Sequence, residues 1–213
     1  VHDLVKLIRA VTDTAPEPIL LLTETNVPNH ENLQYFGNGN EAHIIYNFSL
    51  PPLLVHALLT GQSGFLRQWM MTQPPTLENC TSLNFTASHD GIGLRPLEGL
   101  LPKTDIDKVV EIAKEFGGKV TTRKRDNKDV PYELNITYFD MLKGTFEGID
   151  DYQVERFIAS QTIMMSIEGI PAFYIQSLFG SENDVEKLSR TGQNRAINRH
   201  QWNLEELRNT FKN

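Results

Sequence analysis

Two acidic side chains in this sequence are placed where a carboxyl group could do chemistry. Glu24 follows the apolar run at residues 19–22, so one face of its carboxyl is expected to meet a low-dielectric surrounding that favours the protonated, proton-donating form. Asp90 follows a second apolar segment, with His89 before it and Gly91 after it. This arrangement can hold an ionised carboxylate that stabilises positive charge developing on a sugar ring.

Both residues also have an ordinary structural explanation. Glu24 could be a surface carboxylate that caps the next helix, and His89 to Gly91 could form an Asx-type turn around a hydrogen-bonded histidine. A third candidate, Arg195, lies in the arginine-containing segment at residues 193–200. A guanidinium fork binds carboxylate or phosphate in bidentate fashion, and a solvated basic turn is the alternative.

Composition and spacing argue against several other classes of site. The 213 residues carry a net charge of −7, and the one cluster of basic residues, at 123–125, is too small to favour nucleic acid as a partner. No apolar run approaches the roughly 20 residues that cross a bilayer, so no membrane partner is expected. The histidines lack HExxH spacing and Cys80 has no second cysteine, so we expect no metal site, no disulfide and a reducing, cytoplasmic compartment.

The elements that must position these side chains alternate between strands and helices. Short apolar runs predict strands at residues 19–22, 42–48, 81–86 and 172–175. Helical patterns are found between them, the clearest at 53–59 and 154–167. Such βα units predict an α/β protein with a parallel sheet, and polar residues directly after each strand suggest a (β/α) barrel. Four strands would make half of a barrel, because a complete barrel has eight. Both ends of the chain also look cut.

One segment, residues 94–143, interrupts the alternation. It contains a predicted helix at 105–116, the Gly117-Gly118 stop and a charged loop at 123–129. An insertion of this size after a barrel strand is typical of a lid or specificity subdomain over the site.

Three motifs in this order resemble a known family. They are Thr23-Glu24-Thr25-Asn26-Val27-Pro28, then Asn84-Phe85-Thr86-Ala87-Ser88-His89-Asp90-Gly91-Ile92-Gly93, then Asn198-Arg199-His200. Together they closely resemble the sucrose phosphorylase subfamily of glycoside hydrolase family 13. Within it, the resemblance is to the glucosylglycerate phosphorylase and sucrose 6-phosphate phosphorylase group, over essentially the whole chain.

The resemblance implies a fold. The chain would hold strands 5–8, the C-terminal half of a (β/α)8 TIM barrel, with an α+β subdomain inserted after strand 7. Residues 1–93 would carry strands 5–7 with their helices, residues 94–143 the inserted subdomain, and residues 144–213 the region of strand 8 and the helix after it. The N-terminal half of the barrel and a C-terminal β domain would be absent.

The resemblance also implies roles for individual residues. Glu24 would be the general acid/base and Asp90 the transition-state stabiliser, with His89 touching the donor glucose. Arg195 would contact sugar and phosphate. Tyr132 and Glu133 would fall on a loop that rearranges between donor and phosphate complexes. Glu133 stands where sucrose phosphorylases usually have glutamine, which puts sucrose in doubt as the donor.

The implied reaction is a retaining transfer of glucosyl from a small sucrose-like or glucosylglycerate-like donor to inorganic phosphate, giving α-glucose 1-phosphate without a cofactor. The family's aspartate nucleophile follows the fourth strand in a motif that this chain lacks, so the chain alone is expected to be inactive. It is also expected to self-associate or to bind the missing barrel half. Alternatives are a transglucosylase or α-glucosidase of the same family, or a non-catalytic half-barrel fragment. The sequence does not distinguish fructose, fructose 6-phosphate, glycerate and glycerol as acceptors.

Overall fold

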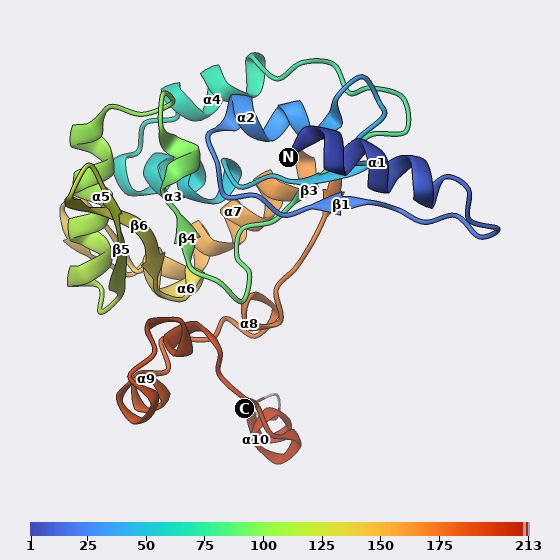
Figure 1. Cartoon of the computed structure of the whole chain (residues 1–213). Coiled ribbons are helices and arrows are strands. Elements are labelled where there is room, and N and C mark those ends of the chain that lie inside the picture. The colour runs from blue at the N-terminus through green and yellow to red at the C-terminus, as the bar shows by residue number, and fades with distance from the viewer. Residues whose placement is uncertain (211, 213) are drawn as a thin grey trace.

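A four-stranded parallel sheet lies at the centre of the fold (Figure 1). The computed structural model describes residues 1–210 and 212, apart from the side chains of residues 206 and 210. The strands follow one another across the sheet in chain order: β1 (Leu22–Thr23), β2 (Ile44–Tyr46), β3 (Thr81–Asn84) and β9 (Ile170–Pro171). All three neighbouring pairs are parallel. The predicted α/β class with a parallel sheet is therefore confirmed.

Helices lie before, between and after these strands in the chain. They are α1 (His2–Thr12), α2 (Asn29–Leu33), α3 (Leu50–Thr60), α4 (Gly64–Met71), α5 (Lys103–Glu115), α6 (Tyr138–Met141), α7 (Gln153–Ser166), α8 (Ile175–Leu178), α9 (Val185–Thr191) and α10 (Leu204–Thr210), with the short 3-10 helices η1 (Gln34–Phe36), η2 (Arg95–Leu97) and η3 (Asn194–Asn198). None of the helices in the described part of the chain is long and apolar enough to cross a membrane.

Helix α3 is the centre of the hydrophobic core. Its prolines lie in the first turn, where a missing N–H costs nothing, and Gly61 ends it in the left-handed conformation. It is apolar on all sides and almost entirely buried, as expected for a core helix. The fully buried Leu53 and Leu54 share one cluster with side chains from α5 and α7, such as Val109 and Met164. The core is thus continuous from the helices of the parallel sheet into residues 94–143.

The segment at residues 94–143 adds an antiparallel layer beside this core. Strands β4 (Ile92–Gly93), β6 (Lys128–Asn135) and β5 (Lys119–Arg125) form a sheet in that order. Asp126 and Asn127 connect β5 to β6 with positive φ at both positions, the geometry of a tight two-residue hairpin. A smaller hairpin, β7 (Gly144–Thr145) with β8 (Gly148–Ile149), follows.

Two of the strand predictions are wrong in detail. The apolar run at residues 19–22 was predicted to form a strand, but only Leu22 belongs to β1, and Leu20 is 67% exposed. This run lies at the edge of the sheet. Among the described strands, β1 pairs with β2 and with no other strand. The last strand was expected at residues 172–175. It pairs instead at Ile170–Pro171, because Gly169 turns the chain against β3 at positive φ, and Ile175 already begins α8.

Candidate active site

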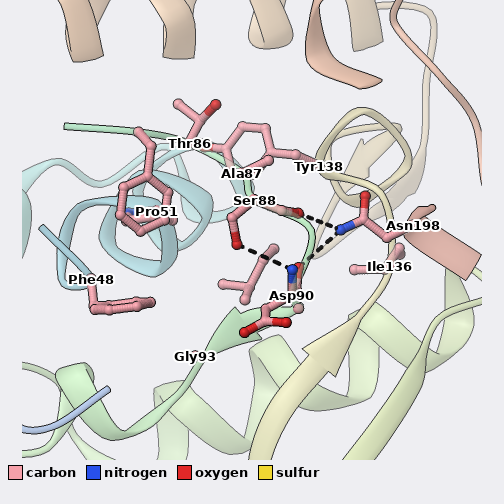
Figure 2. A pocket seen from close by; sticks show the side chains of 13 residues that line it. Phe48, Pro51, Thr86, Ala87, Ser88, Asp90, Gly93, Ile136, Tyr138 and Asn198 are labelled. Atoms are coloured by element: carbon pink, nitrogen blue, oxygen red, sulfur yellow. Dashed lines mark hydrogen bonds between the residues drawn. The ribbon is translucent and has the colours of Figure 1, made fainter. Parts of the chain in front are cut away.

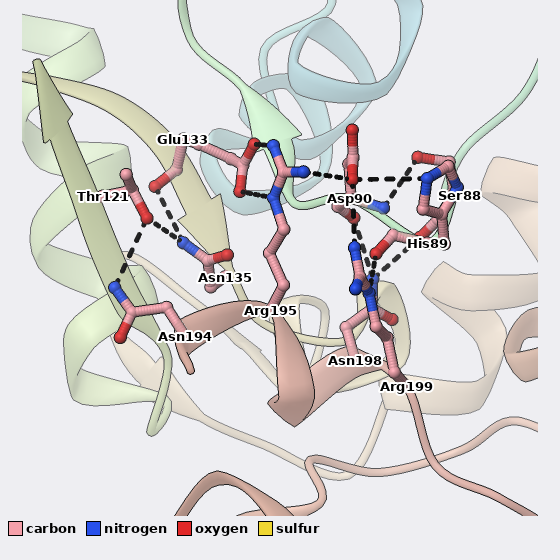
Figure 3. Close-up of polar contacts among 10 residues, drawn as sticks. All are labelled: Ser88, His89, Asp90, Thr121, Glu133, Asn135, Asn194, Arg195, Asn198 and Arg199. Carbon is pink, nitrogen blue, oxygen red and sulfur yellow. Dashed lines mark hydrogen bonds and ion pairs between the residues drawn. The ribbon is translucent and has the colours of Figure 1, made fainter. Parts of the chain in front are cut away.

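Arg195 links two carboxylates at the centre of the polar cluster in Figure 3. Its Nε and Nη2 donate to the two oxygens of Glu133, at 3.0 and 2.7 Å, and its Nη1 lies 2.6 Å from Asp90 Oδ1. The bidentate hydrogen bond with Glu133 raises the pKa of Arg195 above its ordinary value. Glu133 is 2% exposed, so a charge that is costly to bury has its counter-ion in place.

Asp90 receives a second cation and a histidine. Arg199 Nη2 lies 3.3 Å from Asp90 Oδ1, and His89 Nε2 lies 3.5 Å from the same oxygen. The contacts from Arg195, Arg199 and His89 are all made to one oxygen, Oδ1, of the Asp90 carboxylate. Asp90 is therefore held by residues from its own loop and from η3 and the residue after it, although these segments are about a hundred residues apart in sequence.

The loop that carries Asp90 is tied to η3 through its backbone. Asn198 Nδ2 donates to the carbonyls of Ser88 and Asp90 at 2.8 and 2.9 Å, and Arg199 Nε donates to the carbonyl of His89 at 2.7 Å. Ser88 Oγ accepts from the Asp90 N–H, as Figure 2 shows. The small cavity of about 10 Å³ drawn there lies against this loop. Because these bonds fix the loop backbone, they fix the direction of the Asp90 carboxylate.

A pocket of about 180 Å³ brings the predicted residues together. Five of the six, Glu24, Asp90, Tyr132, Glu133 and Arg195, line it. The sixth, His89, is exposed and contacts the pocket through Asp90. The side chains come from the ends of β1 and β3, from β6 and from η3. In a parallel sheet the carboxyl ends of the strands share one edge, which is where open and closed α/β sheets place their ligands.

Glu24 has a different surrounding from the one expected. It follows β1 directly, as predicted, but its side chain is exposed. The low-dielectric surrounding predicted from the apolar run is absent because that run is itself exposed at the sheet edge. Tyr46 lies at the end of β2. Its pKa is raised above the ordinary value, mainly by burial and to a smaller extent by the nearby charge of Glu24.

Sequence reasoning missed two residues that line the pocket, Asn26 and Phe48. Asn26 fits against Gly93, where a Cβ would come within 2.7 Å of its side-chain amide. Gly91 has a similar role: a Cβ there would lie 2.3 Å from the Leu134 carbonyl oxygen and 2.7 Å from Glu133 Cγ. The glycine spacing in the motif at 91–93 was the available signal, because it marks a close approach of the backbone to other groups.

Tyr132 lies on β6, within the β5–β6 hairpin, and lines this pocket. The guanidinium of Arg123 stacks over its ring, 3.5 Å from the ring centroid. Among the described residues, no group of three or more His, Cys, Asp or Glu side chains is arranged to hold a metal ion. The chemistry available at the pocket is that of carboxyl groups, guanidinium groups and a phenol.

Comparison with known proteins gives a consistent set of relatives. No family model matches the chain. The chain is 42% identical over 208 residues to glucosylglycerate phosphorylase of Escherichia coli, a match that covers 97% of this chain and 37% of that protein. It is 31% identical over 181 residues to sucrose phosphorylase of Bifidobacterium adolescentis, covering 79% of this chain and 33% of that protein.

A solved structure agrees with these relatives. The crystal structure of sucrose 6F-phosphate phosphorylase from Thermoanaerobacter thermosaccharolyticum matches with a TM-score of 0.76 at 25% identity. The match covers 92% of this chain and 36% of that one. The chain therefore spans a little over a third of the length of the proteins it resembles.

Proposed function

The chain is a relative of the glucosylglycerate and sucrose phosphorylases, and from this premise we propose that it is the part of a retaining α-glucoside phosphorylase that carries the acid/base and the transition-state stabiliser. Glu24 is the proposed acid/base and Asp90 the proposed stabiliser. The observation that supports this best is the pocket of about 180 Å³, where residues from four separate segments meet at the carboxyl edge of the parallel sheet.

In the proposed first step, Glu24 protonates the glycosidic oxygen as the bond from that oxygen to the anomeric carbon breaks. The anomeric carbon becomes bonded to a carboxylate nucleophile, and the Asp90 carboxylate, which contacts Arg195 and Arg199, stabilises the positive charge that develops on the ring. In the second step, a phosphate oxygen attacks the anomeric carbon, the bond from that carbon to the carboxylate nucleophile breaks, and Glu24 takes up a proton from phosphate. The products are the free acceptor and α-glucose 1-phosphate, with no cofactor.

The remaining site residues bind and orient. His89 is proposed to contact the donor glucose, which fits its exposure beside Asp90. Arg195 is proposed to contact sugar and phosphate, since it lines the pocket and lies next to Asp90. Tyr132 and Glu133 line the same pocket as Glu24 and Asp90 and are proposed to select the donor.

No nucleophile motif of this family is present in the 213 residues, so we propose that the chain alone is inactive. In this proposal the four parallel strands are strands 5–8 of a (β/α)8 barrel. Residues 1–93 and 144–213 belong to the barrel, and residues 94–143 are the subdomain inserted between them. The partners are a small carbohydrate, inorganic phosphate, and either the remaining barrel half or a second copy. The proposed compartment is the cytoplasm.

The test is an assay of the full-length protein that contains this chain, incubated with sucrose, sucrose 6-phosphate or glucosylglycerate, with and without phosphate. We expect α-glucose 1-phosphate from one donor only when phosphate is present, and its loss in Glu24→Gln and Asp90→Asn. Glu17→Gln, an exposed carboxylate near the same strand, is the matched control. Free glucose formed equally with or without phosphate would contradict the proposal and indicate a hydrolase. Transfer of glucosyl to sugars but not to phosphate would indicate a transglucosylase.

A further inference from the structure

The backbone of residues 197–200, the 197–200 segment, is hydrogen-bonded to one other part of the chain. Taken in chain order, its four carbonyls accept from the Asp184 N–H at 2.9 Å, the Tyr174 hydroxyl at 2.9 Å, Lys187 Nζ, and Gln176 Nε2 at 2.6 Å. All four donors lie in α8 and α9 or directly before these helices. The segment therefore cannot shift against α8 and α9 without losing several hydrogen bonds at once.

The side chains of the same segment hold the loop that carries Asp90 (Figure 3). Asn198 Nδ2 donates to the carbonyls of Ser88 and Asp90. Arg199 donates to the carbonyl of His89 through Nε and contacts the Asp90 carboxylate through Nη2. The position of Asp90 thus depends on a segment whose own backbone is fixed by residues 174–187.

Asp184 contacts the 197–200 segment at both ends. Its N–H donates to the Ile197 carbonyl, and its carboxylate oxygen Oδ2 lies 2.8 Å from His200 Nδ1. The other oxygen, Oδ1, accepts from the Lys187 N–H at 2.8 Å and so caps α9. Burial alone would raise the pKa of Asp184, but the Lys187 N–H and His200 outweigh burial and hold this pKa below its ordinary value. One carboxylate therefore joins the start of α9 to the end of the segment.

Tyr174 contacts the middle of the segment through a single atom. Its hydroxyl donates to the carbonyl of Asn198, the residue whose side chain binds two carbonyls of the Asp90 loop. Burial raises the pKa of this hydroxyl, so it remains a protonated donor. Replacing Tyr174 by phenylalanine removes this donor and keeps the ring.

From these contacts we propose that Tyr174 and Asp184 are positioning residues of the candidate active site, which keep the 197–200 segment, and through it the Asp90 carboxylate, in the geometry that the reaction requires. Among the described residues, neither lines the pocket of Glu24 and Asp90, so they act through the segment and not on the substrate. The effect on catalysis rests on the proposed function, because it requires Asp90 to be the stabiliser.

Kinetics of the full-length protein that contains this chain test the catalytic effect. Tyr174→Phe and Asp184→Ser are expected to lower kcat about tenfold and to change KM for the donor less than about twofold, because a displaced Asp90 weakens an interaction made in the transition state. Serine is chosen because it still caps a helix but is too short to reach His200 as well. Tyr152→Phe, at a side chain that is 64% exposed, and Glu186→Gln, at an exposed position of α9, are the matched controls and should leave kcat unchanged. Unchanged kcat in both test variants overturns the proposal.

A double variant tests whether Tyr174 acts through the segment. In an Asn198→Ala background, Tyr174→Phe should lower kcat by less than about threefold, because part of the connection to the Asp90 loop is already lost. A further loss of about tenfold would show that Tyr174 acts by another route and would overturn the proposal.

Hydrogen exchange of the same full-length variants, followed by mass spectrometry without substrate, separates this inference from the proposed function. Peptides covering residues 86–93 are expected to exchange about tenfold faster in Tyr174→Phe and Asp184→Ser than in the unaltered protein and the two controls. Unchanged exchange there overturns the positioning role, whatever the activity. Faster exchange in a protein with no phosphate-dependent reaction overturns the phosphorylase and still supports the role of both residues in holding the Asp90 loop.

Discussion

Arg195 is the residue on which the arrangement of the candidate site depends. One guanidinium makes a bidentate pair with buried Glu133 and a single contact with Asp90, so the position of each carboxylate is fixed relative to the other. Among the residues that the structure describes, Glu133 has no ion-pair partner besides Arg195, whereas Asp90 also contacts Arg199. Removing the charge of Glu133 should therefore affect the fold more than removing the Arg199 contact would.

We predict that Glu133→Gln lowers the free energy of unfolding by about 1–3 kcal/mol, the usual cost of losing a hydrogen bond to a charged group. A glutamine keeps the shape but turns an amide donor toward the donors of Arg195, so one of the two bonds is lost. Urea unfolding of the chain measures the change. Glu111→Gln, an exposed carboxylate on α5, is the control and should change stability by less than about 0.5 kcal/mol. Equal stability of both variants would show that the buried pair contributes nothing.

For single residues, the sequence predicted which side chains belong to the candidate site better than it predicted how buried each of them is. Glu24 and Asp90 were found because their motifs occur in a recognisable order, and Arg195 because a guanidinium suits anionic groups; all three line one pocket. Asn26 and Phe48 were missed because nothing in their types marks them as pocket residues. The exposure of Glu24 could not be read from its neighbours, since whether an apolar run is buried depends on what packs against it.

Among the elements, α3 was the easiest to predict. Its largely apolar pattern, proline start and glycine end agree with one another, so local and tertiary preferences coincide. The last strand was harder to place, because the positive φ of Gly169 and its close approach to Ser82 and Asn84 decide where pairing begins. An apolar run at 172–175 carries no information about that turn.

His56 on α3 is 2% exposed, and burial lowers its pKa below the ordinary 6.5, although Asp105, at 3.3 Å, opposes the shift. The unfolded chain then binds a proton at a pH where the folded chain does not. The contribution of neutral His56 to stability is complete above pH 6.5 and is lost as pH falls through the lower, folded-state pKa.

We therefore predict that the free energy of unfolding, measured in urea, decreases from about pH 7.5 to about pH 5, and that His56→Gln reduces this slope. The slope does not vanish in the variant, because burial also lowers the pKa of His43. His30→Gln, at an exposed position on α2, should leave the slope unchanged. A wild-type stability that rises on acidification in this range would contradict the assignment.

For the whole molecule, the outstanding feature is how much apolar surface remains uncovered around a well-packed core. Leu4, Leu7 and Val11, on one face of α1, are 60%, 60% and 62% exposed. Leu20, beside β1, is 67% exposed. The strands β1 and β9 each have one partner among the described strands. Figure 1 shows α1 and β1 on one side of the molecule. Monomeric proteins seldom leave apolar faces and strand edges of this kind open.

We predict that the purified 213-residue chain self-associates through these surfaces, because burying them removes apolar area from water and pairs the free strand edges. Sedimentation velocity over a concentration series should show a species larger than 24.2 kDa that grows with concentration. The double variant Leu7→Glu/Leu20→Glu should shift the chain toward the monomer, since it places charges on the exposed apolar side of α1 and β1. Gln62→Glu, an exposed loop position, adds charge elsewhere and should leave the distribution unchanged. If the unaltered chain is monomeric throughout, these exposed faces are tolerated in water without a partner, which would contradict the prediction.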